Sequence, residues 1–185
     1  LFVGRLEEYK GIITFLNAII KILENNKYIL NVIVVGDGTL YKQAIKLCKE
    51  SGFLSQFQFL KSIPHKDVLK YHINSDIYVS ANTDGNLINT NLEAISSDAC
   101  MIIPKPQKKK FIDIETYKLL GNAVTYYEVN NVNDLMEKIL YFLENPNKIL
   151  EFKNKISDSK LKFIRTWDER MIEEEEILKN IVANN

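Results

Sequence analysis

The chain has 185 residues, of which 46% are hydrophobic and 26% are charged, as is typical of one globular domain with a sizeable core. Lys plus Arg and Asp plus Glu both number 24, so the overall charge provides no attraction to nucleic acid, and we expect no nucleic-acid partner. No stretch approaches the roughly 18 consecutive apolar residues of a transmembrane helix, and no signal peptide is visible. Cys48 and Cys100 lie far apart in apolar or helical surroundings, so we expect reduced core thiols and a cytoplasmic protein.

Strand-like and helix-like segments alternate along the chain. We expect a strand that ends at Val3 and further strands over residues 29–35, 57–60, 76–80, 100–103 and 123–127. We expect helices over residues 12–25, 39–51, 64–73, from 86 onward, and 133–144. Regular alternation predicts an α/β fold with a Rossmann-like parallel β-sheet of about six strands and helices on both faces.

The two ends of the chain differ from this pattern. Residues 147–185 are predicted to form a helical C-terminal segment with a break near Trp167, so we expect a single domain over residues 1–185. Leu1 already lies inside the first expected strand, which indicates a piece of a longer protein.

Polar and glycine residues follow several of the expected strands. In an open α/β sheet, ligands bind at the carboxyl ends of the strands. The order of strands along the chain places Arg5, Gly36, Lys61, Asp84 and Asn86 at that edge. We therefore expect a ligand site there.

The loop after the first strand has the composition of a phosphate site. Gly4 permits a tight turn, and Arg5 and Lys10 supply two cations, of which Arg can grip phosphate oxygens bidentately. The alternative is that both cations are ordinary surface charges. Gly36 begins a Gly-Asp-Gly turn that lacks the third glycine of the dinucleotide fingerprint, so a phosphate turn and an ordinary strand-to-helix turn are both open.

The segment from Asn86 to Ala94 is the strongest single feature. It follows a strand and has a polar start, so the backbone N–H groups near Leu87, Ile88 and Asn89 are expected at a helix N-terminus that can hold a phosphate. Glu93 falls one to two turns into this helix, where a carboxylate can meet a ribose hydroxyl. The alternative is a solvated helix residue.

The remaining candidates favour ordinary structure. Lys105 and the run Lys108 to Lys110 form a charge cluster that could attract a diphosphate, an anionic acceptor or a membrane surface, although a solvated loop explains it as well. His65 and His72 are expected on the surface. No residues have the spacing of a zinc site or the order of a Ser/His/Asp triad, so we expect no metal.

Several motifs in order carry a resemblance to a known family. They are Phe2-Val3-Gly4-Arg5-Leu6 with Lys10-Gly11, Val34-Val35-Gly36-Asp37-Gly38, Phe57-Gln58-Phe59-Leu60 with Ile63-Pro64-His65, Asp76-Ile77-Tyr78-Val79-Ser80, Asn86 to Ala94, and Thr166-Trp167-Asp168-Glu169-Arg170. The set resembles the C-terminal, nucleotide-sugar-binding domain of a retaining glycosyltransferase of family 4, also called glycosyltransferases group 1, which is one half of a GT-B fold.

The resemblance implies an activity and a setting. Such an enzyme, of the hexosyltransferase type, transfers a sugar from a UDP- or GDP-sugar to an acceptor with retention, here in surface polysaccharide or glycolipid synthesis. It also implies a missing N-terminal acceptor domain, peripheral association of the full enzyme with the inner face of the membrane, and a fragment that is inactive alone.

The resemblance also implies roles for particular residues. The implied catalytic residues are Arg5, Lys10 and Asp84, and the two cations hold the diphosphate without a metal or other cofactor. The other implied donor-binding residues are Gly4 and Gly36 near the nucleotide, Lys61, Ser62 and Ile63 at the nucleobase, Asn86, Leu87, Ile88 and Asn89 at the phosphates, and Glu93 at the ribose.

The chain departs from the family pattern in its acidic pair and in two glycines. Eight residues separate Asp84 from Glu93, where the family has seven, and Lys61 and Asp98 replace common glycines. These departures keep two alternatives open. One is a degenerate, non-catalytic nucleotide-binding or interaction module, and the other is a domain like that of a nucleotide-sugar epimerase.

Overall fold

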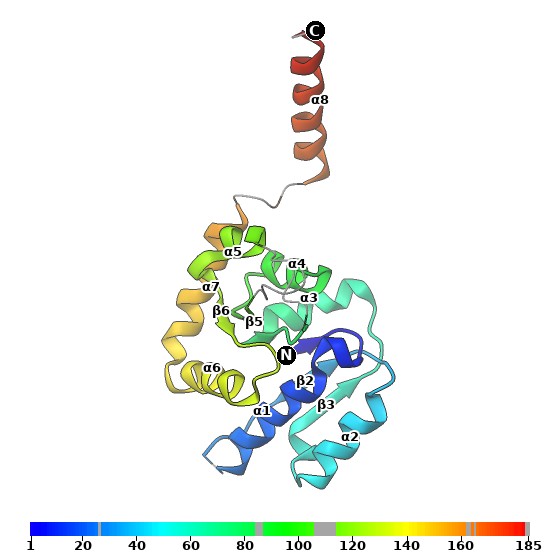
Figure 1. Ribbon diagram of the computed structural model, residues 1–185, viewed down its shortest axis with the longest axis vertical. Coiled ribbons are helices and arrows are strands. Elements are labelled where there is room, and N and C mark those ends of the chain that lie inside the picture. The colour runs from blue at the N-terminus through cyan, green and yellow to red at the C-terminus, as the bar shows by residue number, and fades with distance from the viewer. Residues whose placement is uncertain (26, 84–86, 106–113, 162–163, 165, 184–185) are drawn as a thin grey trace.

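The computed structural model describes residues 1–25, 27–83, 87–105, 114–161, 164 and 166–183. The six strands in these residues form two parallel three-stranded sheets, ordered β1-β2-β3 and β4-β5-β6 (Figure 1). Their bounds are β1 (Phe2–Val3), β2 (Val32–Val35), β3 (Phe57–Leu60), β4 (Tyr78–Val79), β5 (Met101–Pro104) and β6 (Thr125–Tyr127).

The two sheets meet at Leu1, directly before β1. The Leu1 nitrogen donates to the Ile77 carbonyl at 2.8 Å, and the Val79 N–H donates to the Leu1 carbonyl at 2.9 Å. This is the hydrogen-bond pattern of neighbouring parallel strands, so the strands stand in the order β3-β2-β1-β4-β5-β6. The order reverses between β1 and β4, which is the switch point where ligands bind in sheets of this kind. The predicted Rossmann-like parallel sheet is confirmed.

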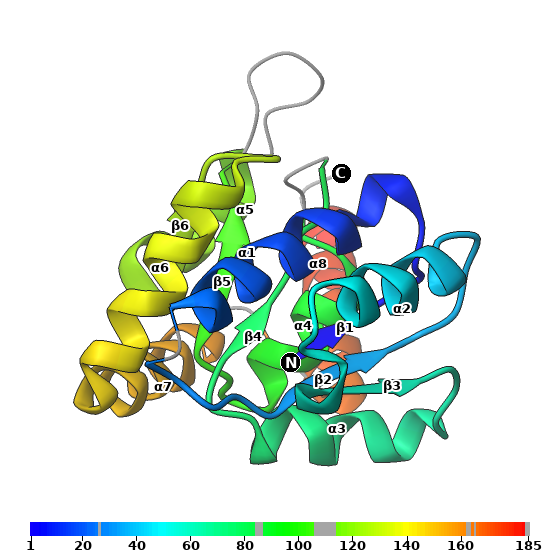
Figure 2. The same cartoon turned by 90° about the horizontal axis from the view of Figure 1, so that it is seen from below.

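Helices cover both faces of the sheet, as expected (Figure 2). One face carries α1 (Ile12–Glu24), α2 (Tyr41–Glu50) and α6 (Val132–Glu144). The other carries α3 (His65–Asn74), α4 (Asn89–Ser96), α5 (Ile114–Leu120) and α7 (Pro146–Lys160). Short 3-10 helices, η1 (Glu8–Lys10), η2 (Leu54–Gln56) and η3 (Gly121–Ala123), lie in the connections.

Alternate residues of the central strands divide between two hydrophobic clusters. Val79 of β4 and Ile102 of β5 pack with α1 and α6, whereas Tyr78 and Met101 pack with α4 and the segment before β6. A strand that is buried on both faces reads as a continuous apolar run, which is why the period-two signal is weak in this sequence.

Both cysteines are buried and free, as expected. Burial raises the pKa of each thiol, Cys48 and Cys100, to about 12, so neither is a reactive thiolate near neutral pH.

The expectation for His72 is wrong. Its side chain is fully buried, and its ring meets the ring of Tyr78 edge-on with centroids 4.9 Å apart. Its two ring nitrogens have no hydrogen-bond partner in the described structure. Burial, and then the amino group of Leu1, lowers the pKa of His72 to about 4, so the ring is neutral at physiological pH.

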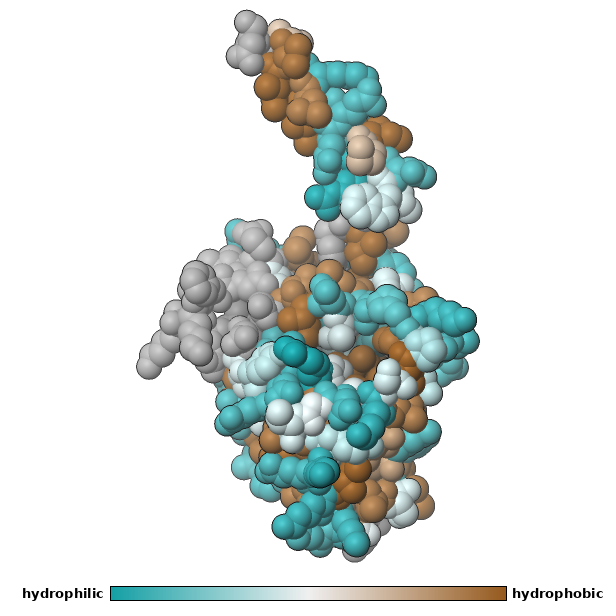
Figure 3. Space-filling view, turned by 90° about the vertical axis from the view of Figure 1, so that its right-hand side faces the viewer, coloured by the Kyte–Doolittle hydropathy of each residue, from teal (hydrophilic) through white to brown (hydrophobic). Residues whose placement is uncertain are grey.

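The last helix, α8 (Trp167–Ala183), stands away from the body, and none of its residues is buried (Figure 1). It begins with a capping box, in which the Glu169 N–H donates to Thr166 Oγ1 at 3.2 Å and the Thr166 N–H donates to Glu169 Oε2 at 2.8 Å. Apolar side chains remain exposed along it (Figure 3), namely Trp167, Met171, Ile172, Ile177, Leu178, Ile181 and Val182. In the described part of the chain, none of the helices combines the length and the apolar character that a membrane span needs.

Candidate functional site

Each of the first two strands is followed by a glycine, and the two glycines, Gly4 and Gly36, lie against each other. The Gly4 N–H donates to the Val35 carbonyl at 3.0 Å, and the Gly36 N–H donates to the Leu60 carbonyl at 2.8 Å. A Cβ atom on Gly36, where φ is +143°, would stand only 1.9 Å from the Gly4 carbonyl oxygen. A glycine at this position therefore lets the loops after β1 and β2 approach each other at the carboxyl edge of the sheet.

The two predicted cations, Arg5 and Lys10, both lie against the side chain of Tyr9. The Arg5 guanidinium donates to the Tyr9 hydroxyl at 2.5 Å and lies 5.8 Å from the centre of its ring. Lys10 Nζ lies 5.0 Å from the centre of the same ring. Cations are attracted to the faces of aromatic rings, so Tyr9 holds both charges in one cluster directly after β1.

The loop after β4 packs against this cation cluster. The Thr83 N–H donates to the Tyr9 carbonyl at 2.9 Å, and the Thr83 hydroxyl lies 3.2 Å from the same oxygen. These contacts cross the switch point between β1 and β4. They bring the cations beside the loop that leads to α4.

A second link orders the loop after β1. The Thr39 hydroxyl donates to Glu7 Oε2 at 2.6 Å, and the Thr39 N–H donates to Glu7 Oε1 at 3.1 Å. The hydroxyl, the backbone N–H and then the nearby Arg5 charge lower the pKa of Glu7, which therefore stays ionised.

The predicted nucleobase segment follows β3. Lys61 Nζ lies 3.5 Å from Asp37 and 4.6 Å from the centre of the Tyr41 ring, so it is tied to the loop after β2. Ser62 is exposed and Ile63 is half-buried, and both precede α3.

The helix that was expected from residue 86 onward begins later, at Asn89 of α4. Ile88 is the N-cap and has no side-chain cap, and its carbonyl accepts from the Asn91 N–H at 2.9 Å. Leu87 and Ile88 are half-buried, and Asn89 is exposed at the first helical position. Because the N-cap residue Ile88 has no polar side chain to cap this end of the helix, the first N–H groups of α4 suit an anionic ligand.

Glu93 is paired across to another helix. Its Oε1 lies 2.9 Å from Nε2 of His65, the first residue of α3. The Glu93 side chain is 23% exposed, whereas that of His65 is 86% exposed. Glu93 also lines a cavity of about 650 Å³ between α4 and α8, together with Leu92 and Arg170.

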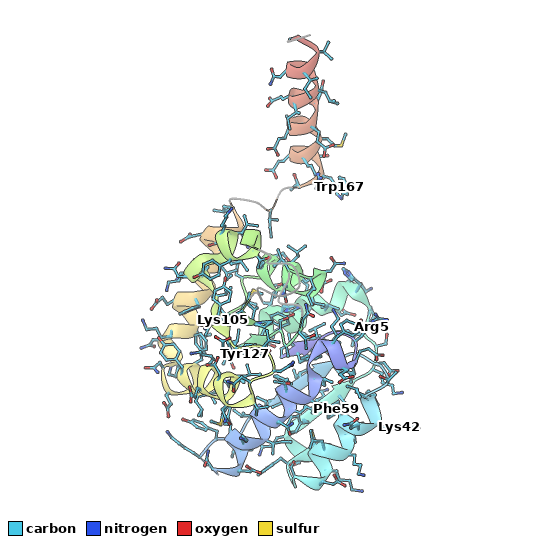
Figure 4. All side chains as sticks on the ribbon, viewed as in Figure 1. Arg5, Lys42, Phe59, Lys105, Tyr127 and Trp167 are labelled. Carbon is cyan, nitrogen blue, oxygen red and sulfur yellow. The ribbon has the colours of Figure 1, made fainter. Side chains whose placement is uncertain are left out.

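Some predicted residues lie outside the described part of the chain, namely Asp84, Asn86 and Lys108 to Lys110. Lys105 is described, and it pairs with Glu128 at 2.5 Å. Figure 4 shows the Lys105 side chain well separated from Arg5. Lys105 therefore does not join the Arg5–Lys10 cluster.

A second cavity, of about 930 Å³, opens at the same edge beside η1 and the start of α1. Tyr9, Thr83, Val129 and Asn130 are among the residues that line it. In the described residues, no group of three or more His, Cys, Asp or Glu side chains is arranged to hold a metal ion.

The structure adds Tyr9, Thr83 and His65 to the residues that the sequence indicated. The aromatic Tyr9 between two cations of one loop was a usable signal. The contacts of Thr83 and His65 join segments far apart in sequence, so no local pattern indicated them.

The amino-acid sequence identifies the family to which this chain belongs. Residues 1–159 match the model of the family "Glycosyl transferases group 1". The chain therefore belongs to this family. No sequence among the curated proteins matches it significantly.

Solved structures of the same fold are similar to nearly the whole chain. The C-terminal domain of the group 1 glycosyl transferase LpcC from Francisella tularensis is 20% identical, with a TM-score of 0.72 over 88% of this chain and 83% of that one. The catalytic domain of the cholesterol-α-glucosyltransferase from Helicobacter pylori is 22% identical, with a TM-score of 0.68 over 88% and 96% of the two chains.

A third similar structure is HepE from Anabaena in complex with UDP. It is 14% identical, with a TM-score of 0.76 over 98% of this chain and 48% of that one. This chain thus spans about half the length of HepE. At these identities the similarity establishes the fold, which is that of the C-terminal domain of GT-B glycosyltransferases.

Proposed function

We propose that this chain is the donor-binding domain of a retaining glycosyltransferase of family 4, which transfers a sugar from a nucleotide-diphosphate sugar to an acceptor. The observation that carries the proposal is the position of Arg5, Lys10 and Glu93. All three lie on βα connections or early helical turns at the carboxyl side of one sheet, beside its switch point. Membership of the glycosyl transferases group 1 family supports it.

The proposed mechanism is electrostatic. Negative charge develops on the leaving diphosphate as the bond to the sugar breaks, and cations fixed in advance stabilise that charge without reorganising. Arg5 and Lys10, already clustered on Tyr9, supply the positive charge. The N–H groups at the start of α4 add to it, so no metal is required.

The proposed donor lies across the switch point. Gly4 and Gly36 leave room for it, and Glu93 accepts hydrogen bonds from the ribose. The segment Lys61 to Ile63 meets the nucleobase, and Asp84 approaches the donor sugar. HepE was solved with UDP, which favours a UDP-sugar over a GDP-sugar as the donor.

We further propose that residues 1–185 form one domain of a two-domain enzyme and are inactive alone. The span of about half of HepE supports a missing acceptor domain. The exposed apolar side chains of α8 also support it, because such a stripe needs a partner, and the helix does not pack on its own sheet. The proposed setting is surface polysaccharide or glycolipid synthesis at the cytoplasmic face of the membrane.

A non-catalytic nucleotide-binding module is the second candidate. Lys61 stands where the family commonly has a glycine, and its pairing with Asp37 fills part of the edge after β3. A module of this kind would bind nucleotide but transfer no sugar when an acceptor domain is restored.

Calorimetric titration with UDP and GDP tests donor binding. Arg5→Ala and Glu93→Ala each remove a charge-assisted hydrogen bond, so each should weaken binding by about 1.5–3 kcal/mol, or roughly 10- to 150-fold. Lys49→Ala and Glu137→Ala make the same charge changes at exposed positions on α2 and α6 and should leave binding unchanged. Absence of binding at millimolar nucleotide, or equal losses in all four variants, would contradict the proposal.

A further inference from the structure

His65 is an exposed side chain that pairs with a more protected carboxylate. It begins α3, directly after Pro64, and its Nε2 lies 2.9 Å from Glu93 Oε1 on α4. The two residues are 28 positions apart in the sequence, and the contact joins two successive βα units. Because His65 itself is 86% exposed, its burial contributes little to the core.

The geometry fixes which atoms can interact. An ionised carboxylate only accepts hydrogen bonds, so His65 donates through Nε2–H to Oε1. A carboxylate has two oxygens and can accept several hydrogen bonds, so Oε2 is still able to accept from another donor. A Glu side chain has several rotatable bonds, and holding one oxygen limits the positions that the other can take.

The residues around Glu93 show why the hydrogen bond from His65 matters for the orientation of its side chain. Leu92, Ser96 and Arg170 line the cavity of about 650 Å³ beside it, and two acidic residues of α8, Glu173 and Glu174, line the same space. Glu174 is paired with Arg170 at 2.9 Å, so its charge is already compensated, whereas the Glu173 carboxylate disfavours a Glu93 side chain that turns toward α8. The His65 contact holds it toward the carboxyl end of β3 instead.

We propose that His65 is a positioning residue for the nucleotide, which acts by holding Glu93 in the orientation that accepts hydrogen bonds from the ribose hydroxyls. This inference rests on the proposed function and deepens it, because it assigns ribose selectivity to a pair of residues. His65 touches neither the ribose nor the diphosphate. Its whole effect passes through the Glu93 carboxylate.

Calorimetric titration of UDP and of 2′,3′-dideoxyuridine diphosphate tests the inference. His65→Ala should weaken UDP binding about 3- to 10-fold, because the Glu93 side chain must then be ordered on binding. The dideoxy compound lacks both hydroxyls, so it should bind more weakly than UDP. Its affinity should be the same for the unaltered chain and for His65→Ala. His65→Gln keeps an N–H donor and should restore most of the affinity for UDP.

A double-mutant cycle separates positioning from a structural effect. In a Glu93→Gln background, His65→Ala should cause no further loss, because the residue through which it acts is already altered. Lys66→Ala, which removes an exposed side chain from the next position of α3, is the matched control and should leave the affinity unchanged. The midpoint of thermal unfolding should be the same in His65→Ala and Lys66→Ala.

The possible outcomes distinguish this inference from the proposed function. Binding of UDP that weakens in Glu93→Gln but not in His65→Ala would overturn the role of His65 alone. So would equal losses for UDP and the dideoxy compound, or losses that add in the double variant. Absence of UDP and GDP binding by the unaltered chain would overturn both the proposed function and the positioning role.

Discussion

Gly11, which precedes α1, lies directly against Ala81, two residues after the end of β4. A Cβ atom on Gly11 would stand 2.0 Å from the Ala81 carbonyl oxygen. The contact crosses the switch point between β1 and β4, so it sets how closely α1 approaches the loop that leads to α4. Gly11 also has a φ of +67°, a conformation that other residues rarely adopt.

We predict that Gly11→Ala destabilises the domain far more than Gly52→Ala. Gly52 has a φ of +82°, but a Cβ atom at this position would meet nothing within 4 Å, so its replacement measures the backbone strain alone, about 1–2 kcal/mol. Gly11→Ala adds a clash with fixed backbone and should cost about 1–3 kcal/mol more. Urea unfolding of the two variants measures the difference. Equal losses of unfolding free energy in the two variants would show that the backbone at Gly11 and Ala81 can move apart without destabilising the domain.

Because His72 is buried with a lowered pKa, we predict that the stability of the domain depends on pH. The pKa of His72 is about 4 in the folded chain, against an ordinary value of 6.5. Below pH 6.5 the unfolded chain binds a proton that the folded chain does not. The contribution of His72 to stability is therefore present above pH 6.5 and is lost as the pH drops toward 4, by about 2 kcal/mol at pH 5.

Urea unfolding of His72→Phe at pH 7.5 and 5 checks this prediction. Phenylalanine keeps a ring against Tyr78 but cannot be protonated. The difference in unfolding free energy between the two pH values should be smaller in the variant than in the unaltered chain. Equal differences would mean that His72 does not titrate in this range.

Tyr9 is predicted to matter for nucleotide binding through its hydroxyl. Tyr9→Phe keeps the ring beside Lys10 but removes the group that accepts from Arg5, so UDP should bind about 0.5–1.5 kcal/mol more weakly. Tyr28→Phe removes a hydroxyl that lies 3.4 Å from Glu144, away from the site, and should leave binding unchanged. Calorimetry compares the two. Tighter binding by Tyr9→Phe would mean that the hydroxyl competes with the diphosphate for Arg5.

Removal of α8 is predicted to leave the body of the domain intact. No residue of α8 is buried, so a chain that ends at Thr166 should unfold within about 2 °C of the longer one. This cut keeps Ile164, which packs on the second core cluster. Calorimetric unfolding measures the midpoint. A loss of many degrees would show that α8 packs on this domain in solution.

Sequence patterns predicted most helices and strands, but several of their ends were wrong and one helix was missed. The apolar periodicity over residues 12–25 agrees with α1, which ends at Glu24, and β3 has the predicted bounds. The strand expected over residues 29–35 is shorter, because only residues 32–35 pair with β3. Strand ends depend on their neighbours and cannot be found from one segment. The helix α5 was missed because it follows a lysine-rich stretch that resembles a loop.

In the candidate site, too, the contacts that depend on distant segments could not be predicted from the sequence. The loop glycines and the cations were predicted from their place after strands, and the structure puts them at the carboxyl edge. His72 was predicted wrongly, although its spacing of four from the buried Val68 on one helix face could have indicated the core. The pairing of His65 with Glu93 exists only because two βα units pack together.

A crystal structure of the chain grown with UDP would test the proposed donor site most directly. We expect the diphosphate between Arg5, Lys10 and the start of α4, with a ribose hydroxyl within hydrogen-bond distance of Glu93. Nucleotide bound only at a place that contacts none of Arg5, Lys10 and Glu93 would contradict the proposed donor site.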